Sequence, residues 1–167
     1  ADARPVLLFM PTVPHVDDPV MTSVARWDEK PKIILDPERK WQAIGKSDAA
    51  LIASGTVSLE LARSSVPMIS CYKCDPVMRM VQSLITVWSA ALPNLIADRP
   101  VVPESYNQYV RPHYLARQLE ALFADTAYRA WQKDGFVEVA RPMATDRPSG
   151  DIAADVVLRH VKLRHGK

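Results

Sequence analysis

The sequence has 167 residues, of which 48% are hydrophobic and 24% are charged, and its formal net charge is +2. This length and composition fit one ordinary hydrophobic core and exclude a disordered, collagen-like or disulfide-rich protein. The 21 basic residues are spread along the chain rather than gathered into a block, so we do not expect a nucleic acid as a partner.

Short apolar runs alternate with amphipathic segments along the chain. Strands are expected at residues 6–10, 32–35, 49–53 and 67–72, the first of them buried on both faces. Helices are expected at residues 19–27, 39–47, 57–64, 77–91, 112–124, 127–139 and 152–163, with a proline-containing loop after Asn94. This alternation predicts an α/β fold built on a doubly wound parallel sheet.

The first candidate site is the turn Ser54-Gly55-Thr56, which joins an expected strand to a helix that begins at Val57. Ligands of parallel sheets bind at the carboxyl ends of the strands, where amides at helix N-termini suit phosphate. Glu60 lies one turn into the helix, where its carboxylate would accept hydrogen bonds from ribose hydroxyls. The alternatives are an ordinary strand-to-helix turn and a solvated carboxylate balanced by Arg63.

Two further polar residues lie in the region that follows. Asn94 comes after Leu92-Pro93, and a rigidly presented amide there suits a sugar hydroxyl or a phosphate oxygen, or it caps the next helix. Glu104 follows Val101-Val102-Pro103. Its carboxylate would hold ribose, orient a loop or face water, and the residues alone do not decide between these roles.

The segment Met78 to Trp88 is strongly apolar and carries one cation, Arg79, with Leu84 among its apolar members. An apolar helix with a basic edge is a candidate for contact with anionic lipid, although such helices are also found in protein cores. The apolar stretch of residues 77–92 is interrupted by polar residues and falls short of the roughly 20 residues that span a bilayer.

Cys71 and Cys74 form a C-x-x-C pair, which allows half a zinc site, a redox pair or two thiols near a strand end. No second Cys/His cluster follows and the four histidines have no ligand spacing, so we favour the third alternative and expect neither metal nor cofactor. There is no secretory signal pattern, which predicts a cytoplasmic location. The chain does not begin with Met, and we expect it to be a piece of a longer protein.

Several of these motifs, in this order, resemble the lipid-A-disaccharide synthase family. The resemblance rests on residues 47–62 (SDAALIASGTVSLELA), 66–69 (VPMI), 92–97 (LPNLIA) and 101–104 (VVPE). It implies the C-terminal, Rossmann-like half of a GT-B glycosyltransferase, with residues 1–150 binding the nucleotide sugar. Residues 151–167 would form a helix that packs across onto an N-terminal domain missing from this chain.

The resemblance also implies a reaction, its participants and their location. The enzyme would transfer 2,3-diacylglucosamine from its UDP carrier to 2,3-diacylglucosamine 1-phosphate, forming a β-1,6 disaccharide and UDP, at the cytoplasmic surface of the inner membrane of a Gram-negative bacterium. No metal is needed in this architecture, and the catalytic base would lie on the N-terminal domain. This chain alone would therefore bind the donor without completing the reaction.

Individual residues receive roles from the same resemblance. The amides and hydroxyls of Ser54, Gly55, Thr56 and Val57 would stabilise the leaving diphosphate. Glu60 would fix the ribose, and Asn94 would contact the diphosphate or sugar.

Glu104 would support the loop near Asn94, and Lys73 keeps a cation where the family has Arg. Met78, Arg79, Leu84 and Trp88 would contact the membrane. The alternatives are another UDP-sugar enzyme of this architecture (a UDP-N-acetylglucosamine epimerase or the peptidoglycan glycosyltransferase) and a stand-alone nucleotide-binding module.

Overall fold

The computed structural model of the chain describes residues 6–53, 55–75, 87–124 and 126–165. Its strands are β1 (Phe9–Pro11), β2 (Lys32–Ile34), β3 (Ala50–Ile52), β4 (Met68–Tyr72) and β5 (Glu104–Tyr106). Its helices are α1 (Asp17–Val24), α2 (Pro37–Gly45), α3 (Val57–Arg63), α5 (Leu92–Ala97), α6 (Pro112–Phe123), α7 (Ala127–Met143) and α8 (Ser149–His165). Short 3-10 helices cover Pro14–Val16 and Asn107–Tyr109.

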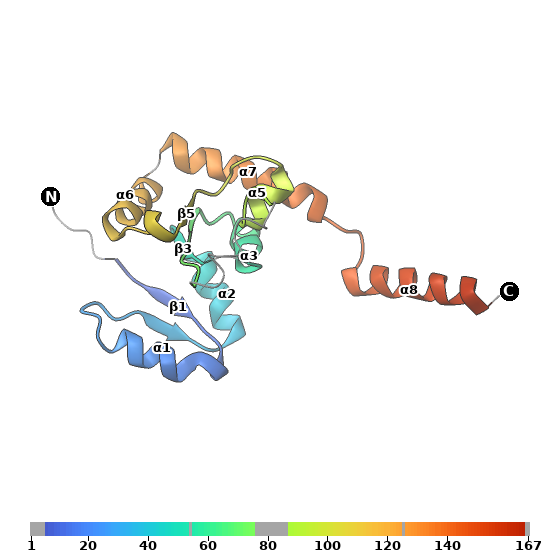
Figure 1. The fold of residues 1–167 in the computed structure, drawn as a ribbon, viewed down its shortest axis with the longest axis horizontal. Helices are drawn as coiled ribbons and strands as arrows, with labels where there is room; N and C mark the ends of the chain where they lie inside the picture. The colour runs from blue at the N-terminus through green and yellow to red at the C-terminus, as the bar shows by residue number, and fades with distance from the viewer. Residues whose placement is uncertain (1–5, 54, 76–86, 125, 166–167) are drawn as a thin grey trace.

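All the described strand pairs are parallel. β1 pairs with β2, and a second sheet has the order β3-β4-β5. Figure 1 shows the β1–β2 pair with α1 in the lower part of the molecule and the three-stranded sheet above it. The predicted α/β fold with parallel strands is confirmed.

Helices cover both faces of the three-stranded sheet, and β4 shows why. Successive side chains of a strand point to opposite faces. Met68 packs into one apolar cluster with Leu61 and Phe136, whereas its neighbour Ile69 packs into another with Leu115 and Leu122. The first cluster joins α3 and α7, and the second joins α6 to the other face. The sheet is therefore wound on both sides, as the sequence predicts.

Helix α7 completes the core through two close contacts. The buried amide of Gln132 accepts a hydrogen bond from the backbone N–H of Met68 (2.9 Å) and donates one to the Met68 carbonyl (3.0 Å). Gly135 of the same helix faces Val101, and a β-carbon built on Gly135 would lie only 2.6 Å from Val101 Cγ1. The absence of a side chain lets α7 approach the segment before β5.

One expectation about secondary structure is wrong, and a second is wrong at its described end. Residues 6–8 lie outside β1 and their side chains are 38–59% exposed; in the described part of the chain β1 pairs only with β2, so this region is not buried on both faces. The expected helix at residues 77–91 lies partly outside the described residues. Its described end, residues 87–91, is not helical, because the amides of Ala90 and Ala91 donate to Glu104.

The segment after Leu92 also differs from the expected loop, because it contains α5 and β5. At the other end of the chain, α8 extends away from the rest of the molecule (Figure 1). Its apolar residues Val156, Val157, Leu158 and Val161 are 45–61% exposed. Within the described residues, no helix is both long enough and apolar enough to cross a bilayer.

Candidate functional site

The turn between β3 and α3 is held by two serine hydroxyls. Gly55 has φ +94°, a left-handed conformation that glycine adopts without strain. The hydroxyl of the buried Ser58 donates to the Gly55 carbonyl at 2.6 Å, and that of Ser70 on β4 donates to the Ala53 carbonyl at 3.3 Å. Ser54, the first predicted site residue, lies outside the described residues.

Strand register brings this turn and Lys73 to the same edge of the sheet. Ile52 of β3 is paired with Ser70 of β4, so Gly55 and Lys73 each follow their paired residue by three positions. Lys73 is exposed just beyond the end of β4. Both residues therefore lie at the carboxyl edge, where parallel sheets bind ligands.

Thr56 and Val57 begin α3 at this edge. Thr56 is exposed and occupies the N-cap position without a capping hydrogen bond from its side chain, and Val57 is half-buried. The first amides of a helix have no partner within the helix. Their N–H groups are therefore suited to bind oxygen atoms of a ligand.

Glu60 forms an ion pair in the first turn of α3. Lys40 Nζ of α2 lies 2.8 Å from Glu60 Oε1 and 2.6 Å from Oε2. The two side chains are 30% and 28% exposed, although Oε2 of Glu60 is itself buried. The sequence suggested Arg63 as a partner for Glu60, but the partner is a lysine twenty residues earlier.

Asn94 is buried within a network of internal hydrogen bonds. Its Oδ1 accepts from the backbone N–H groups of Val101 and Val102, both at 2.7 Å. Its Nδ2 donates to the Val102 carbonyl at 2.9 Å and lies within 3.2 Å of acceptors on Ser89 and Glu104. Asn94 is 1% exposed and belongs to the first turn of α5, so its amide holds the backbone before β5.

Glu104 is the second centre of this network. Its carboxylate accepts from the Ser89 hydroxyl (2.6 Å), the Ala90 and Ala91 amides (3.1 and 2.9 Å) and the Tyr106 hydroxyl. Burial and the hydrogen bond to Glu104 raise the pKa of Tyr106 above its usual value. Of the three roles that the sequence left open for Glu104, orientation of a loop fits these contacts.

The predicted site residues thus form two groups. Gly55, Thr56, Val57 and Glu60 share one turn, with Lys73 at the same edge, whereas Asn94 and Glu104 share the network at the start of β5. Helices α3 and α5 pack against each other, but among the described residues no hydrogen bond or ion pair that we identify joins a member of one group to a member of the other. Sequence patterns do not identify Lys40, Ser58, Ser89 or Tyr106, because the contacts of these residues depend on the packing of separate elements.

Of the predicted membrane-contact residues, Met78, Arg79 and Leu84 lie outside the described residues. Trp88 is 53% exposed and Val87 beside it is 56% exposed. The following residues, Ser89 to Ala91, are held by Glu104. The exposed apolar pair is therefore attached to a firmly bonded segment.

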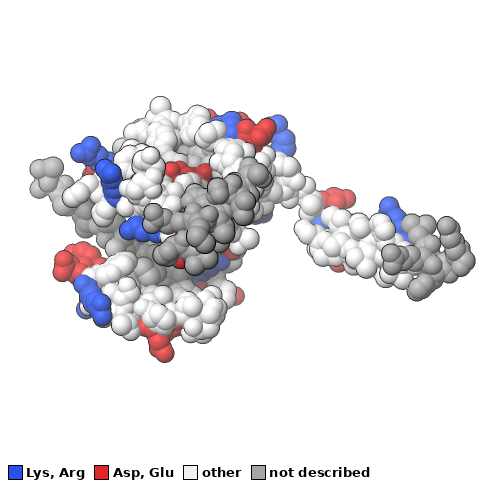
Figure 2. Space-filling model, viewed as in Figure 1, with Lys and Arg blue, Asp and Glu red and all other residues white. Residues whose placement is uncertain are grey.

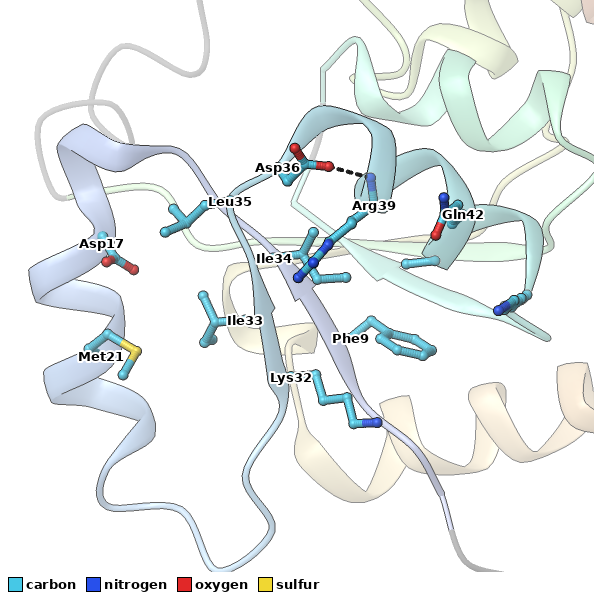
Figure 3. A pocket seen from close by; sticks show the side chains of 12 residues that line it. Phe9, Asp17, Met21, Lys32, Ile33, Ile34, Leu35, Asp36, Arg39 and Gln42 are labelled. Carbon is cyan, nitrogen blue, oxygen red and sulfur yellow. Dashed lines mark hydrogen bonds between the residues drawn. The ribbon is translucent and has the colours of Figure 1, made fainter.

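A cavity of about 640 Å³ lies elsewhere, beside β2 and between α1 and α2 (Figure 3). Its lining includes the apolar side chains of Phe9, Met21 and Ile33 and the cations Lys32 and Arg39. None of the predicted site residues lines it. On the face seen in Figure 2, basic and acidic side chains lie in several small groups, some of which contain both signs.

Both cysteines are free thiols. Cys71 lies on β4 and Cys74 just beyond it, both half-buried, and burial raises the pKa of the Cys71 thiol. In the described part of the chain, no three His, Cys, Asp or Glu side chains are grouped as a metal site requires. The expectation that neither metal nor cofactor is bound stays a prediction.

Comparison with known proteins identifies the family. The sequence model of the lipid-A-disaccharide synthetase family matches residues 5–148. The chain is 34% identical to the lipid-A-disaccharide synthase of Bradyrhizobium diazoefficiens over 160 residues, covering 95% of this chain and 41% of that protein. It is 38% identical to the synthases of Rhodopseudomonas palustris strain HaA2 and Rhodospirillum centenum, covering 90% and 94% of this chain.

In these two cases the match covers 39% and 40% of the relative. The chain thus spans about two fifths of the length of the curated relatives that it matches. The matched residues include the β3–α3 turn and both centres of the network around Asn94 and Glu104. The chain belongs to the lipid-A-disaccharide synthetase family.

Proposed function

We propose that this chain supplies the donor-binding part of a lipid-A-disaccharide synthase. The observation that carries the proposal is the family match over residues 5–148, which contains a glycine turn at the carboxyl edge of a parallel sheet with a carboxylate one helical turn beyond it. The full reaction would transfer 2,3-diacylglucosamine from UDP to 2,3-diacylglucosamine 1-phosphate. Its products are the β-1,6 disaccharide and UDP.

The chemistry divides between the two halves of such an enzyme. Glycosyl transfer needs a base for the acceptor hydroxyl and donors that stabilise the negative charge on the departing diphosphate. We assign the second task to this chain, through the N–H groups of Gly55, Thr56 and Val57 and the hydroxyl groups of Ser54 and Thr56. Lys73 at the same edge adds a positive charge. The base would come from an N-terminal domain, so this chain alone would bind donor without turning it over.

Glu60 would accept hydrogen bonds from the ribose, and Asn94 and Glu104 would act on the donor mainly by fixing the backbone around α5. The prediction that Asn94 itself contacts the diphosphate or sugar remains to be tested. Its described contacts engage both Oδ1 and Nδ2 inside the protein. Family membership favours this activity over a UDP-sugar epimerase, the peptidoglycan glycosyltransferase and a stand-alone nucleotide-binding module.

Calorimetric titration tests the donor site directly. We expect UDP to bind and ADP to bind at least about 10-fold more weakly. Glu60→Ala should weaken UDP binding by about 10-fold or more, because hydrogen bonds to a charged group contribute about 1.5–3 kcal/mol each.

The matched control is Glu38→Ala, which removes an exposed glutamate from the first turn of α2. It should leave the affinity for UDP unchanged. Equal affinity for UDP and ADP, or unchanged UDP affinity in Glu60→Ala, would contradict the proposed site.

Because both proposed substrates carry acyl chains, we also propose that the protein works on the inner-membrane surface, with Met78, Arg79, Leu84 and Trp88 in contact with lipid. Support comes from the exposed pair Val87 and Trp88. Exposed aromatic side chains of this kind favour the lipid–water interface.

Trp88→Ser should lower the fraction of protein that sediments with vesicles of phosphatidylethanolamine and phosphatidylglycerol. Trp27→Ser, which alters another exposed tryptophan (43%), should leave it unchanged. Equal sedimentation of the two variants and the unaltered chain would refute lipid contact by Trp88.

A further inference from the structure

Lys40 and Glu60 form an ion pair between two consecutive helices, α2 and α3. One ammonium nitrogen lies within 2.8 Å of both carboxylate oxygens. The pair is only partly buried, and ion pairs that solvent reaches contribute little to folding stability. The hydrophobic core nevertheless fixes where the pair lies, because both helices that carry it pack into that core.

The core fixes where the two side chains meet. Ile44 is one helical turn after Lys40 on the same face of α2, and it is buried in the cluster that also contains Leu61, the residue after Glu60. Residues four apart on a helix are neighbours on its surface. Burial of Ile44 therefore brings Lys40 to α3, and Lys40 Nζ also lies 5.3 Å from the centre of the Trp41 ring.

The Lys40 contact leaves part of the Glu60 carboxylate available. A carboxylate has about four acceptor positions on its two oxygens. Lys40 Nζ donates to Oε1 at 2.8 Å and lies 2.6 Å from Oε2. Because Oε2 is buried, about one position is left for another donor, on Oε1. The 2′-hydroxyl of a ribose provides one such donor.

We propose that Lys40 is a positioning residue for ribose recognition: it holds the Glu60 carboxylate in the orientation in which Oε1 accepts a hydrogen bond from the ribose 2′-hydroxyl. This inference rests on the proposed function, because it takes the nucleotide to bind at the β3–α3 turn. A free glutamate on a helix surface must lose rotamer freedom when it binds a ligand. The ion pair with Lys40 restricts the rotamers of Glu60 before the nucleotide binds, which lowers this cost.

The test compares UDP with 2′-deoxy-UDP in calorimetric titrations of the 167-residue chain. The unaltered chain should prefer UDP by about 10-fold, the effect of one hydrogen bond to a charged group. Lys40→Met keeps the apolar stem beside Trp41 but removes the charge. It should reduce the preference to about 2-fold or less by weakening UDP binding, with 2′-deoxy-UDP binding changed by no more than about 2-fold.

Three further variants separate positioning from general effects. Lys40→Arg should restore most of the preference for UDP. Adding Lys40→Met to Glu60→Gln should cause no further loss, because Lys40 acts through Glu60. Arg99→Met breaks the Arg99–Glu138 pair, whose arginine is similarly exposed (32%), and should leave both affinities unchanged.

Each other outcome has a distinct meaning. If a folded Lys40→Met variant binds UDP and 2′-deoxy-UDP more weakly by the same factor, the positioning role is overturned. An unchanged preference for UDP over 2′-deoxy-UDP would also overturn it. Thermal unfolding of each variant checks that it is folded, and if Lys40→Met does not fold, Lys40→Gln replaces it with the same expectation. UDP binding without preference over 2′-deoxy-UDP in the unaltered chain would overturn this inference alone. Failure to bind UDP would overturn the proposed donor site as well.

Discussion

At the scale of single residues, the most heavily bonded side chains are Asn94 and Glu104. Both were predicted as site residues from the sequence, but their partners were not predicted. Asn94 bonds backbone groups seven and eight residues later, and Glu104 accepts from residues 13 to 15 positions earlier. Such contacts depend on how α5 packs before β5, and no local pattern encodes that packing.

Replacing Asn94 with alanine should be strongly destabilising. The change leaves the buried N–H groups of Val101 and Val102 without an acceptor and opens a small cavity. We expect the free energy of unfolding to fall by about 2–4 kcal/mol, measured by urea denaturation. Gln108→Ala, which removes an exposed amide, should change it by less than about 0.5 kcal/mol. Similar values for the two variants would show that the network contributes little.

Tyr106 gives a prediction for alkaline pH. Its raised pKa means that the folded chain keeps the phenol proton above pH 10, about where the unfolded chain loses it. The contribution of the protonated Tyr106 phenol to the free energy of unfolding is therefore complete below about pH 10. It is lost as the pH rises further. Tyr106→Phe should be less stable than the unaltered chain at pH 8, and the difference should narrow in urea denaturation above pH 10. A constant or widening difference would contradict the raised pKa.

At the scale of elements, the long apolar and amphipathic segments were predicted well. The expected strands at residues 32–35, 49–53 and 67–72 overlap β2, β3 and β4, and the last three expected helices overlap α6, α7 and α8. The short elements α5 and β5 were missed. Proline is compatible with the first turn of a helix, so Leu92-Pro93-Asn94 does not distinguish a helix start from a loop.

Gly135 in α7 and Gly45 in α2 provide a matched pair of glycine substitutions. Alanine in place of glycine inside a helix normally stabilises by about 0.5–1 kcal/mol. At Gly135 the added methyl group would overlap the buried Val101, so Gly135→Ala should instead lower the free energy of unfolding by about 1–3 kcal/mol. Gly45 at the end of α2 has open space around it, and Gly45→Ala should be neutral or stabilising. Stabilisation by both changes would refute close packing of α7.

At the scale of the whole molecule, the parallel α/β class and the family follow from the sequence, because they depend on the order of many elements and motifs. The location of the β3–α3 turn at the carboxyl edge also follows from that order. The Lys40–Glu60 pair could not be predicted, since it requires α2 and α3 to pack at one defined distance. That residues 151–167 pack across onto an N-terminal domain stays a prediction.

The central claim is that UDP binds at the β3–α3 turn, and hydrogen exchange of backbone amides tests it most directly. With saturating UDP, exchange should slow at residues 55–60, and saturating ADP should have a much smaller effect. Protection confined to β2 and the cavity beside it, with the turn unchanged, would contradict this account, as would the absence of any protection.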